Sequence, residues 1–239
     1  MTRIKTVILS LLFLIVTIQG EEIYATFSVE AEKSANLAFT SSGTVKSINV
    51  EVATVVKKGE LLAQLQNSDL KAALNIAVTA LKYAKKEYDR QLKVQKLVDA
   101  SKLDGYAFKY ESAKAQVAYQ QALLDKTLLN APFHGIIFSK NIEEGDVVSA
   151  AMIRTVFKMQ SIDKRKLVLE FDQKYWKDIK MGQRFTYAID GDTKKYRGEI
   201  SKIYPFADSG NRKIKAEVIV EDFVVGLFGD GYITVPDTK

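Results

Sequence analysis

The chain has 239 residues, 47% of them hydrophobic, with no cysteine, a single histidine (His134) and a formal net charge of +6 at pH 7. These counts exclude a disulfide framework, a cysteine nucleophile, a cysteine-ligated zinc ion, a lipidated N-terminal cysteine and any site built from several histidines. The basic residues are spread along the chain and form no continuous stripe, so the sequence gives little support for binding to nucleic acid.

Residues 1–20 contain two basic residues followed by an apolar run from Val7 to Ile18. A run of this length is typical of the apolar core of a secretory signal peptide and is short for a transmembrane helix. The sequence therefore predicts an exported protein whose signal peptide, residues 1–20, is cleaved near Gly20 or Ala25. Retention of the segment as an uncleaved anchor is the alternative.

An internal repeat is the strongest signal in the sequence. Residues 43–61 align without gaps with residues 135–153, and the identical pairs are Gly43/Gly135, Ser47/Ser139, Asn49/Asn141, Glu51/Glu143, Val55/Val147 and Val56/Val148. Each copy holds two short runs of β-branched residues, and the residues expected to shape the turns are Gly43, Gly59, Pro132, Gly135 and Gly145. Neither copy could bury its apolar face alone, so the two copies are expected to close into one domain.

Between the two copies, the segment from Asp69 to Leu129 has the pattern of a long antiparallel helical hairpin. The first helix is expected to run unbroken to Val98, with a seam of residues at alternating steps of four and three: Leu70, Leu74, Ala77, Leu81, Ala84, Tyr88, Gln91, Gln95 and Val98. The second helix is expected from Tyr106 to Leu129, and two stripes compete for its seam. One contains Phe108, Ser112, Ala115, Tyr119, Ala122 and Leu129, and the other contains Tyr110, Val117, Leu124 and Leu128. A seam rich in alanine and glutamine buries little apolar area, so the hairpin is expected to project and meet a partner, or to be long for a mechanical reason.

Short strands dominate the remaining sequence. Alternating apolar residues from Ile23 to Ala31 indicate a half-buried strand. After Met159, further strands are expected over residues 167–171, 185–189, 196–204, 214–220 and 232–235, with a short helix over 173–179. Short strands with this regular spacing are typical of a small antiparallel barrel, which the first strand is expected to join.

Several stretches resemble the periplasmic adaptors, or membrane fusion proteins, of resistance–nodulation–division efflux systems, an HlyD-like family. LAFTSSGTVKSINVEVATVVKKGELLAQL is similar to the first lipoyl half-motif of that family, and LLNAPFHGIIFSKNIEEGDVV is similar to the second. IKMGQRF and GEISKIYP are similar to parts of the barrel that follows. The resemblance covers nearly all of the chain beyond the signal peptide, and the APF sequence after the second helix is its most specific part.

The resemblance implies an α+β, mostly β fold: a lipoyl-like (biotinyl-lipoyl) β-domain split by a coiled-coil helical hairpin and followed by a small antiparallel β-barrel. The expected boundaries are 23–36 for N-terminal strands that join the barrel, 37–67 and 131–160 for the two halves of the lipoyl-like domain, 68–130 for the hairpin and 161–239 for the barrel. The membrane-proximal domain of longer relatives is expected to be absent or reduced. Ala53 and Ala151 stand where the family often has glycine, so we expect that these turns need no positive φ.

The resemblance also implies a contact site at the tip of the hairpin. The family favours a basic residue, a leucine and a serine where the hairpin meets an outer-membrane channel, and the matching positions are Lys93, Leu97 and Asp104. Asp104 departs from the serine, but its carboxylate is expected to cap the second helix by accepting a hydrogen bond from the amide of Tyr106 or Ala107.

The function implied by the resemblance is that of a non-enzymatic adaptor in the periplasm, peripherally associated with the inner membrane and serving multidrug efflux. Its expected partners are an inner-membrane transporter of the resistance–nodulation–division type, an outer-membrane channel and further copies of the chain in a ring, either a hexamer or a trimer of dimers. No cofactor, catalytic residue, metal ligand or nucleic-acid partner is expected.

Two alternatives stay open at this point. Within the same class, the chain could be the adaptor of an ATP-driven exporter or of a type I secretion system. From a different class, it could be a lipoyl or biotin carrier, which needs a lysine at the tip of the turn joining the two halves. In this sequence the predicted hairpin takes the place of that turn.

Overall fold

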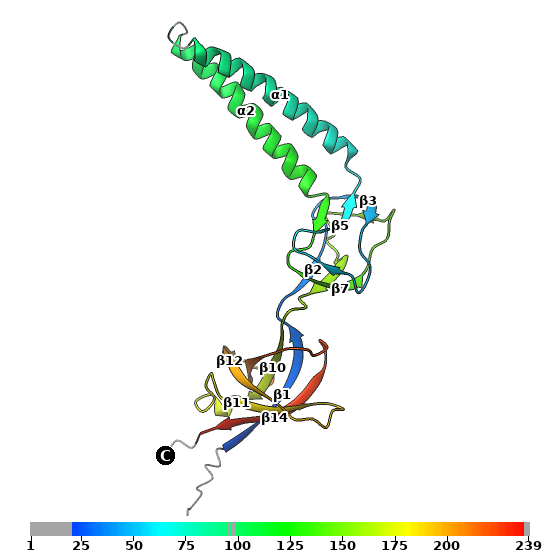
Figure 1. The fold of residues 1–239 in the computed structure, drawn as a ribbon, viewed down its shortest axis with the longest axis vertical. Helices are drawn as coiled ribbons and strands as arrows, with labels where there is room; N and C mark the ends of the chain where they lie inside the picture. Colours follow the sequence, from blue (N-terminus) through cyan, green and yellow to red (C-terminus); the bar gives the residue numbers. More distant parts are fainter. Residues whose placement is uncertain (1–20, 95, 97–98, 237–239) are drawn as a thin grey trace, which may run out of the picture. The chain divides into compact units, whose positions relative to one another are not determined.

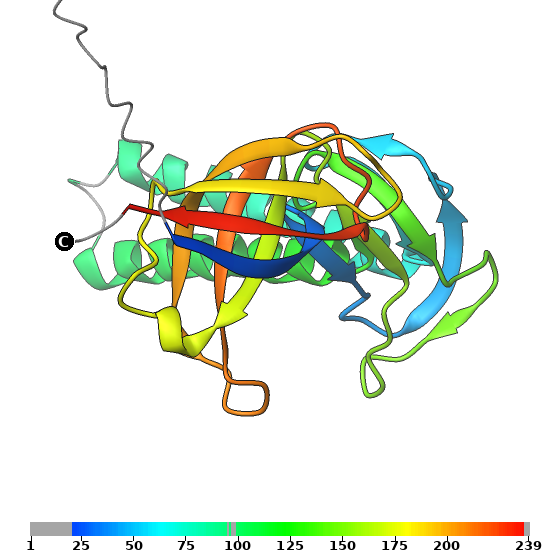
Figure 2. The ribbon, with the colours of Figure 1, turned by 90° about the horizontal axis from the view of Figure 1, so that it is seen from below.

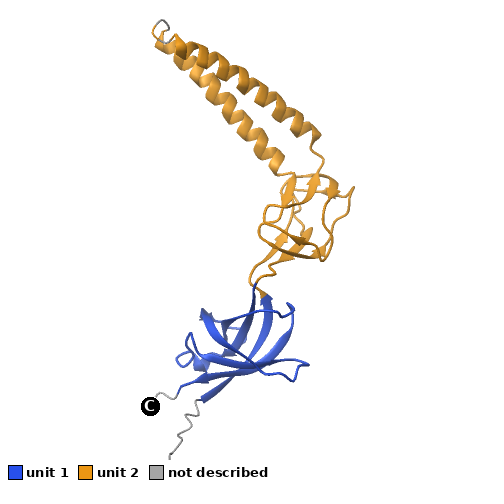
Figure 3. Ribbon diagram, viewed as in Figure 1, with its two compact units in different colours: residues 1–30, 164–239 blue, residues 31–163 orange. Residues whose placement is uncertain are grey.

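The computed structural model describes residues 21–94, 96 and 99–236, and the chain divides into two compact units (Figure 3). Residues 31–163 form the first, which we call the sandwich unit. The second, which we call the barrel unit, combines the N-terminal strand up to Glu30 with the chain from Lys164 onward. The predicted fold class is confirmed, because the chain folds into two small sheets, a helical hairpin and a closed barrel (Figure 1).

The sandwich unit contains two four-stranded sheets, with the orders β2-β9-β7-β4 and β6-β5-β3-β8. The strands are β2 (Ser34–Leu37), β3 (Gly43–Ile48), β4 (Val55–Val56), β5 (Leu61–Leu65), β6 (Leu128–Asn130), β7 (Gly135–Lys140), β8 (Val147–Val148) and β9 (Phe157–Gln160). Apolar side chains from both copies of the repeat share one core, which includes Val45, Leu62, Ile137 and Phe157.

The two copies of the repeat exchange strands. β3 of the first copy pairs with β8 of the second, and β4 of the first pairs with β7 of the second. The two registers are equivalent, because Gly43 lies opposite Val148 and Gly135 lies opposite Val56. At Gly135 the chains approach so closely that a Cβ atom would lie 2.3 Å from the carbonyl oxygen of Gln160, so only glycine fits. Neither sheet is therefore complete without a strand from the other copy.

The helical hairpin starts and ends at neighbouring positions of one sheet (Figure 1). α1 (Ser68–Lys93) follows β5, and α2 (Ala100–Asp125) leads into β6, which pairs with β5. At this base the buried side chains of Asn67 and Thr127 meet, and Nδ2 of Asn67 donates a hydrogen bond of 2.8 Å to Oγ1 of Thr127. The Thr127 hydroxyl in turn donates to the carbonyl oxygen of Leu124. The Asn67 side chain therefore joins the two ends of the hairpin and does not cap α1.

The predicted helix boundaries are wrong at the tip and at the end of the second helix. α1 ends at Lys93 and not at Val98, while α2 begins at Ala100 and not at Tyr106. Gly105 lies inside α2, where a glycine costs about 1 kcal/mol relative to alanine but does not end the helix. The last residues of the predicted helix form β6 instead, so the hairpin is shorter than the predicted range 68–130.

The two helices pack along a seam of small and aromatic residues. On α1, the predicted stripe from Leu70 to Gln91 is buried or half-buried, as the alternating spacing indicates. Where the helices face each other, the rings of Tyr88 and Tyr110 stack with their centroids 5.7 Å apart. Lys85 lies over the Tyr110 ring at 5.9 Å from its centroid. No helix in the described part of the chain is both long enough and apolar enough to cross a membrane.

On α2, one of the two competing stripes forms the seam. Tyr110, Val117 and Leu124 are half-buried or buried against α1. The stripe through Phe108 and Tyr119 points away from α1, and these two side chains are 73% and 58% exposed. The interpretation of the stripe through Phe108 and Tyr119 as the seam is therefore wrong.

The barrel unit is a closed six-stranded barrel in the order β1-β10-β13-β12-β11-β14. Its strands are β1 (Glu21–Ala31), β10 (Arg165–Asp172), β11 (Arg184–Ile189), β12 (Tyr196–Ala207), β13 (Lys213–Val220) and β14 (Phe228–Val235), and the short helix η2 (Gln173–Tyr175) follows β10. β1 lies beside β14, drawn in blue and red in Figure 2, and its alternate residues enter the core. β2 pairs with β9 in the sandwich unit, so the predicted assignment of residues 23–36 to the barrel is wrong for this strand.

The outer face of the barrel buries one carboxylate, that of Glu217 on β13. Lys166 and Lys202 donate to it over 2.7 and 3.0 Å, and the Tyr204 hydroxyl donates over 2.7 Å. Burial alone would raise the pKa of Glu217, but the three hydrogen bonds outweigh burial and lower the pKa from 4.5 to about 2. The ionised carboxylate thereby joins β10, β12 and β13.

One turn of the sandwich unit adopts a conformation that the sequence does not predict. Ala53 has a φ of 71°, so the expectation that its turn needs no positive φ is wrong. Its amide donates to the carbonyl oxygen of Ile137, and the repeat-equivalent Gly145, with a φ of 90°, donates in the same way to Val45. The exchange of strands therefore imposes a left-handed residue in both copies, and only the second copy has a glycine there. Ala151 is not among the described residues with a positive φ.

We expect Ala53→Gly to stabilise the protein by about 0.5–1 kcal/mol. A left-handed conformation costs alanine about 1–2 kcal/mol, and the greater freedom of glycine in the unfolded chain offsets about half of the gain. Thermal melting measures the effect. Ala151→Gly is the matched control, because it adds the same freedom without relieving a positive φ and should leave the melting temperature unchanged or lower. A lower melting temperature for Ala53→Gly would contradict the assignment of strain.

Thr127→Val should destabilise the protein by about 1–3 kcal/mol, because it removes the acceptor of the buried Asn67 amide while preserving the shape of the side chain. Thermal melting followed by circular dichroism is the measurement. Thr79→Val is the control, since the Thr79 hydroxyl is exposed and bonds only the Asn75 carbonyl oxygen within α1. Equal melting temperatures for the two variants would show that the Asn67–Thr127 bond does not stabilise the base of the hairpin.

The low pKa of Glu217 predicts a loss of barrel stability in acid. A carboxyl whose pKa is 4.5 unfolded and about 2 folded stabilises the native state above pH 4.5, and this contribution disappears as the pH falls towards 2. Urea unfolding should show a loss of about 2 kcal/mol between pH 6 and pH 3 from this group. Glu217→Gln should remove that part of the pH dependence, and the exposed control Glu221→Gln should retain it. An unchanged pH dependence in Glu217→Gln would refute the assignment.

Candidate functional site

His134, the single histidine of the chain, is engaged in structural contacts. Nδ1 of His134 lies 2.9 Å from the carbonyl oxygen of Val56, and its Nε2 lies 3.9 Å from a carboxylate oxygen of Asp163. In the part of the chain that the structure describes, no group of three or more histidine, aspartate or glutamate residues could hold a metal ion.

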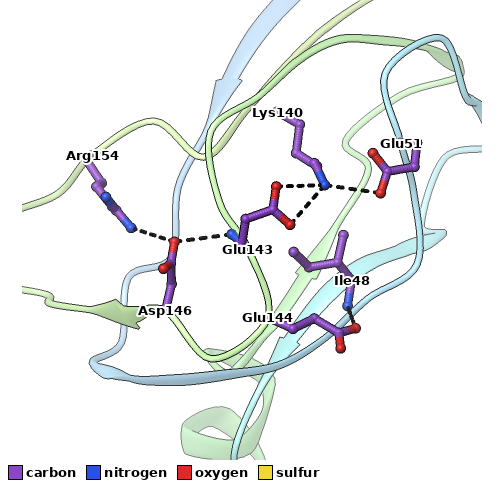
Figure 4. A network of polar contacts seen from close by, with 7 residues as sticks. All are labelled: Ile48, Glu51, Lys140, Glu143, Glu144, Asp146 and Arg154. Atoms are coloured by element: carbon purple, nitrogen blue, oxygen red, sulfur yellow. Dashed lines mark hydrogen bonds and ion pairs between the residues drawn. The ribbon is translucent and has the colours of Figure 1, made fainter.

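The acidic residues of the repeat hold the turns of the sandwich unit (Figure 4). The repeat-equivalent residues Glu51 and Glu143 both bind the Lys140 ammonium, at 3.0 and 3.1 Å. Hydrogen bonds to these two carboxylates raise the pKa of Lys140. Glu144 accepts a hydrogen bond of 3.0 Å from the backbone amide of Ile48. Glu143 and Glu144 therefore have separate structural partners.

The five predicted turn residues all lie in the sandwich unit. Gly43 and Gly135 begin β3 and β7, while Gly59 and Gly145 occupy loops with φ values of 84° and 90°. Pro132 is exposed between β6 and β7. Their positions match a role in shaping the two sheets.

The tip of the hairpin is the first candidate surface. At the end of α1, the amide of Val94 donates to the carbonyl oxygen of Gln91 over 3.1 Å. At the start of α2, Oδ1 of Asp99 accepts a hydrogen bond of 2.9 Å from the amide of Ser101. Local hydrogen bonds thus satisfy one amide at the end of α1 and one at the start of α2.

The structure places two of the three predicted tip residues. Lys93 is the exposed last residue of α1, and Asp104 is exposed within α2. The predicted capping role of Asp104 is wrong, because Asp99 caps the helix five residues earlier. Leu97 lies outside the described residues. The contact of these residues with a channel stays a prediction.

A second candidate surface runs along the outside of the hairpin and was missed by sequence reasoning. Phe108 and Tyr119 are exposed on α2, and Ile76 and Tyr83 are exposed on α1. Exposed apolar and aromatic residues in such number on one hairpin are typical of a protein interface. The signal was present as the two competing stripes of the second helix, since one stripe forms the seam and leaves the other for a partner.

Comparison with known proteins connects this architecture to a family. Residues 33–159, which include most of the sandwich unit and the whole hairpin, match the CzcB-like, barrel-sandwich hybrid domain. The chain is 24% identical over 205 residues to the cobalt-zinc-cadmium resistance protein CzcB of Cupriavidus metallidurans, covering 78% of this chain and 39% of that protein. It is 22% identical over 242 residues to the nodulation protein NolF of Rhizobium meliloti, covering 92% of this chain and 64% of that protein. The chain thus spans less than two thirds of the length of these relatives.

Solved structures share the fold at low sequence identity. A MacA-MexA chimeric protein that contains the Pseudomonas aeruginosa MexA α-hairpin domain superposes with a TM-score of 0.83 at 23% identity, covering 91% of this chain and 83% of that one. The membrane fusion protein Spr0693 from Streptococcus pneumoniae gives a TM-score of 0.72 at 17% identity, covering 90% and 100%. Because the family match extends over more than half of its residues, the chain belongs to the family of CzcB-like barrel-sandwich hybrid domains, and its resemblance to the membrane fusion proteins of efflux systems is confirmed.

Proposed function

We propose that this chain is the periplasmic adaptor subunit of a tripartite export pump, in which it links an inner-membrane efflux transporter to an outer-membrane channel. The observation that supports this proposal most strongly is the helical hairpin inserted at the midpoint of a barrel-sandwich hybrid domain, with a closed barrel as a separate unit. The role is non-enzymatic and consists of holding partners at fixed positions. The transporter is proposed to be of the resistance–nodulation–division type.

The tip of the hairpin is the proposed contact with the channel. Lys93 is exposed there and offers an ammonium donor for carbonyl or carboxylate groups of a partner. Asp104 adds an exposed carboxylate close to the start of α2. Leu97 is the proposed apolar residue of this contact, and an apolar side chain of its size contributes about 1–2 kcal/mol in an interface.

The outer face of the hairpin is the proposed contact between copies of the chain. Phe108 and Tyr119 on α2 and Ile76 and Tyr83 on α1 are exposed, so one hairpin offers apolar residues on both of its helices. With exposed apolar residues on each helix, one hairpin can contact two neighbouring copies, as assembly into a closed ring requires. We propose a ring of this kind, a hexamer or a trimer of dimers, in the periplasm and peripherally associated with the inner membrane.

The structure gives no support to a lipoyl or biotin carrier. A carrier needs a lysine at the tip of a tight turn that joins the two halves of the domain. In this chain β5 leads into α1 and α2 leads into β6, so the hairpin occupies the join.

Cross-linking in intact cells tests the proposed linkage. After purification of the cross-linked chain, mass spectrometry should identify both an inner-membrane transporter and an outer-membrane channel. An ATP-driven transporter in place of the resistance–nodulation–division type would change the class of pump, and recovery of neither partner would overturn the proposal. Growth of a deletion strain on a panel of drugs and on cobalt, zinc and cadmium salts would then identify the exported substrate.

We predict that Lys93→Glu abolishes export and lowers the free energy of unfolding by no more than about 1 kcal/mol, the effect of reversing one charge in the last turn of a helix. Lys71→Glu is the matched control, because it makes the same charge change at the exposed base of α1 and should retain export. Susceptibility of cells and thermal melting of the purified variants are the two measurements. Normal export by both Lys93→Glu and Leu97→Glu would remove the tip assignment.

A further inference from the structure

One end of the barrel unit gathers exposed aromatic and basic side chains. β1 begins at this end with Glu21, opposite Val235 at the end of β14. β10 ends there with Asp172, opposite Lys213 at the start of β13. We call it the distal end, because the chain leaves for the sandwich unit from the opposite ends of β1 and β10.

The distal end has an open groove of about 610 Å³ between η2 and the bulged end of β12. The groove is lined mainly by apolar and aromatic residues, which include Phe171, Trp176, Ile203 and Phe206. Trp176 and Phe206 are exposed, as is Met181 on the loop between η2 and β11. Trp176 and Phe206 thus face water on one groove, and Met181 is exposed on the loop that follows η2; exposed apolar side chains of this kind are typical of an interaction surface.

Three lysines lie next to Trp176 and Met181 in the sequence. Lys174, Lys177 and Lys180 are exposed, and none of them forms an ion pair within the described chain. Lys177 Nζ lies 5.2 Å from the ring centroid of Trp176, so charge and apolar surface are directly adjacent. From Gln173 to Met181 the three lysines accompany a single acidic residue, Asp178, which leaves this segment with a net positive charge. We call Trp176, Met181, Phe206 and the three lysines the distal patch.

The apolar N-terminal run of the sequence joins the barrel at the same end. The run from Val7 to Ile18 precedes Glu21, the first residue of β1. A hydrogen bond with Tyr175 raises the pKa of Lys174 on η2, and the carboxylates of Asp172 and Glu21 raise it further. The charge of Glu21 at the start of β1 is therefore felt at η2. A second groove, lined by residues of early β1 and of η2, also places these two elements side by side. Before any cleavage, the most apolar segment of the chain is therefore attached next to the distal patch.

We propose that the distal patch binds the surface of a phospholipid membrane, with the three apolar side chains at the level of the headgroups and the three lysines at lipid phosphates. Tryptophan beside lysine around an apolar cluster is the combination found where proteins meet the membrane interface. Lysines that form no ion pair in the described chain match the negative charge of anionic lipid. This contact rests on the proposed peripheral association with the inner membrane and names the surface that makes it, whereas the link between transporter and channel does not itself require the adaptor to touch lipid.

Trp176 is the only tryptophan of the chain, so its fluorescence in the full-length protein reports on the distal patch alone. Vesicles of phosphatidylcholine with phosphatidylglycerol should shift the emission of Trp176 to shorter wavelength. Phosphatidylcholine brominated on its acyl chains should quench the emission. Both effects should weaken in vesicles without phosphatidylglycerol, because the lysines then lose their anionic partners.

Two pairs of variants distinguish lipid binding by the distal patch from an effect of net charge and from binding by the N-terminal run. Lys177→Glu with Lys180→Glu should raise at least tenfold the lipid concentration that gives half of the Trp176 shift, since each lysine near an anionic surface contributes about fivefold in affinity. Lys57→Glu with Lys58→Glu makes the same change of net charge in the sandwich unit and should leave this concentration unchanged. Phe206→Ser should reduce the quenching by brominated lipid, and Phe228→Ser, an exposed phenylalanine at the other end of the barrel, should not.

Vesicles that sediment with the protein but leave the Trp176 emission unchanged would show that only the N-terminal run binds lipid, and would overturn the proposal. A Trp176 response to the co-purified transporter but not to vesicles would assign the patch to a protein partner and would overturn it equally. Failure of the channel link alone would leave the fluorescence result intact, so the two proposals fail separately.

Discussion

The exchange of two-residue strands between the copies of the repeat is the constraint on which the sandwich unit depends. β4 and β8 are too short to form a sheet by themselves, and each pairs only with a strand of the other copy. The exchange closes one shared core, imposes left-handed residues at Ala53 and Gly145, and places β5 beside β6. Because the hairpin starts after β5 and ends before β6, its two ends are held together by the same exchange, and the Asn67–Thr127 hydrogen bond completes this base.

Because of this base, the stability of the sandwich unit does not depend on the outer surfaces of the hairpin. The seam of the hairpin uses one face of each helix, with Tyr88 stacked on Tyr110, and the outer faces take no part in the core of the sandwich unit. Substitutions at Lys93, Phe108 or Tyr119 should therefore change the free energy of unfolding little. The barrel unit is a second, independent core with its own buried carboxylate, so surfaces at its distal end can vary without disturbing the hairpin.

The repeat and the strands were predictable because both depend on local patterns. Identical spacing of glycine and valine in the two copies indicated one domain, and alternation from Ile23 onward indicated β1. The ends of the helices at the tip were not predictable from the absence of proline and glycine, since the tip depends on the capping of α2 by Asp99. Gly105 is tolerated because one glycine costs less than the packing of a whole helix provides. The positive φ of Ala53 follows from its hydrogen bond to the distant residue Ile137, which no local pattern reveals.

Because the two ends of the hairpin lie side by side, the length of the hairpin can change without any change in the sandwich unit. α1 and α2 have 26 residues each, which corresponds to about 39 Å at 1.5 Å per residue. Insertion of seven residues into each helix preserves the alternating seam and adds about 10 Å, while every strand, turn and hydrogen bond of the sandwich unit keeps its place. Paired heptad insertions would therefore lengthen the hairpin without any compensating change in the domain from which it projects.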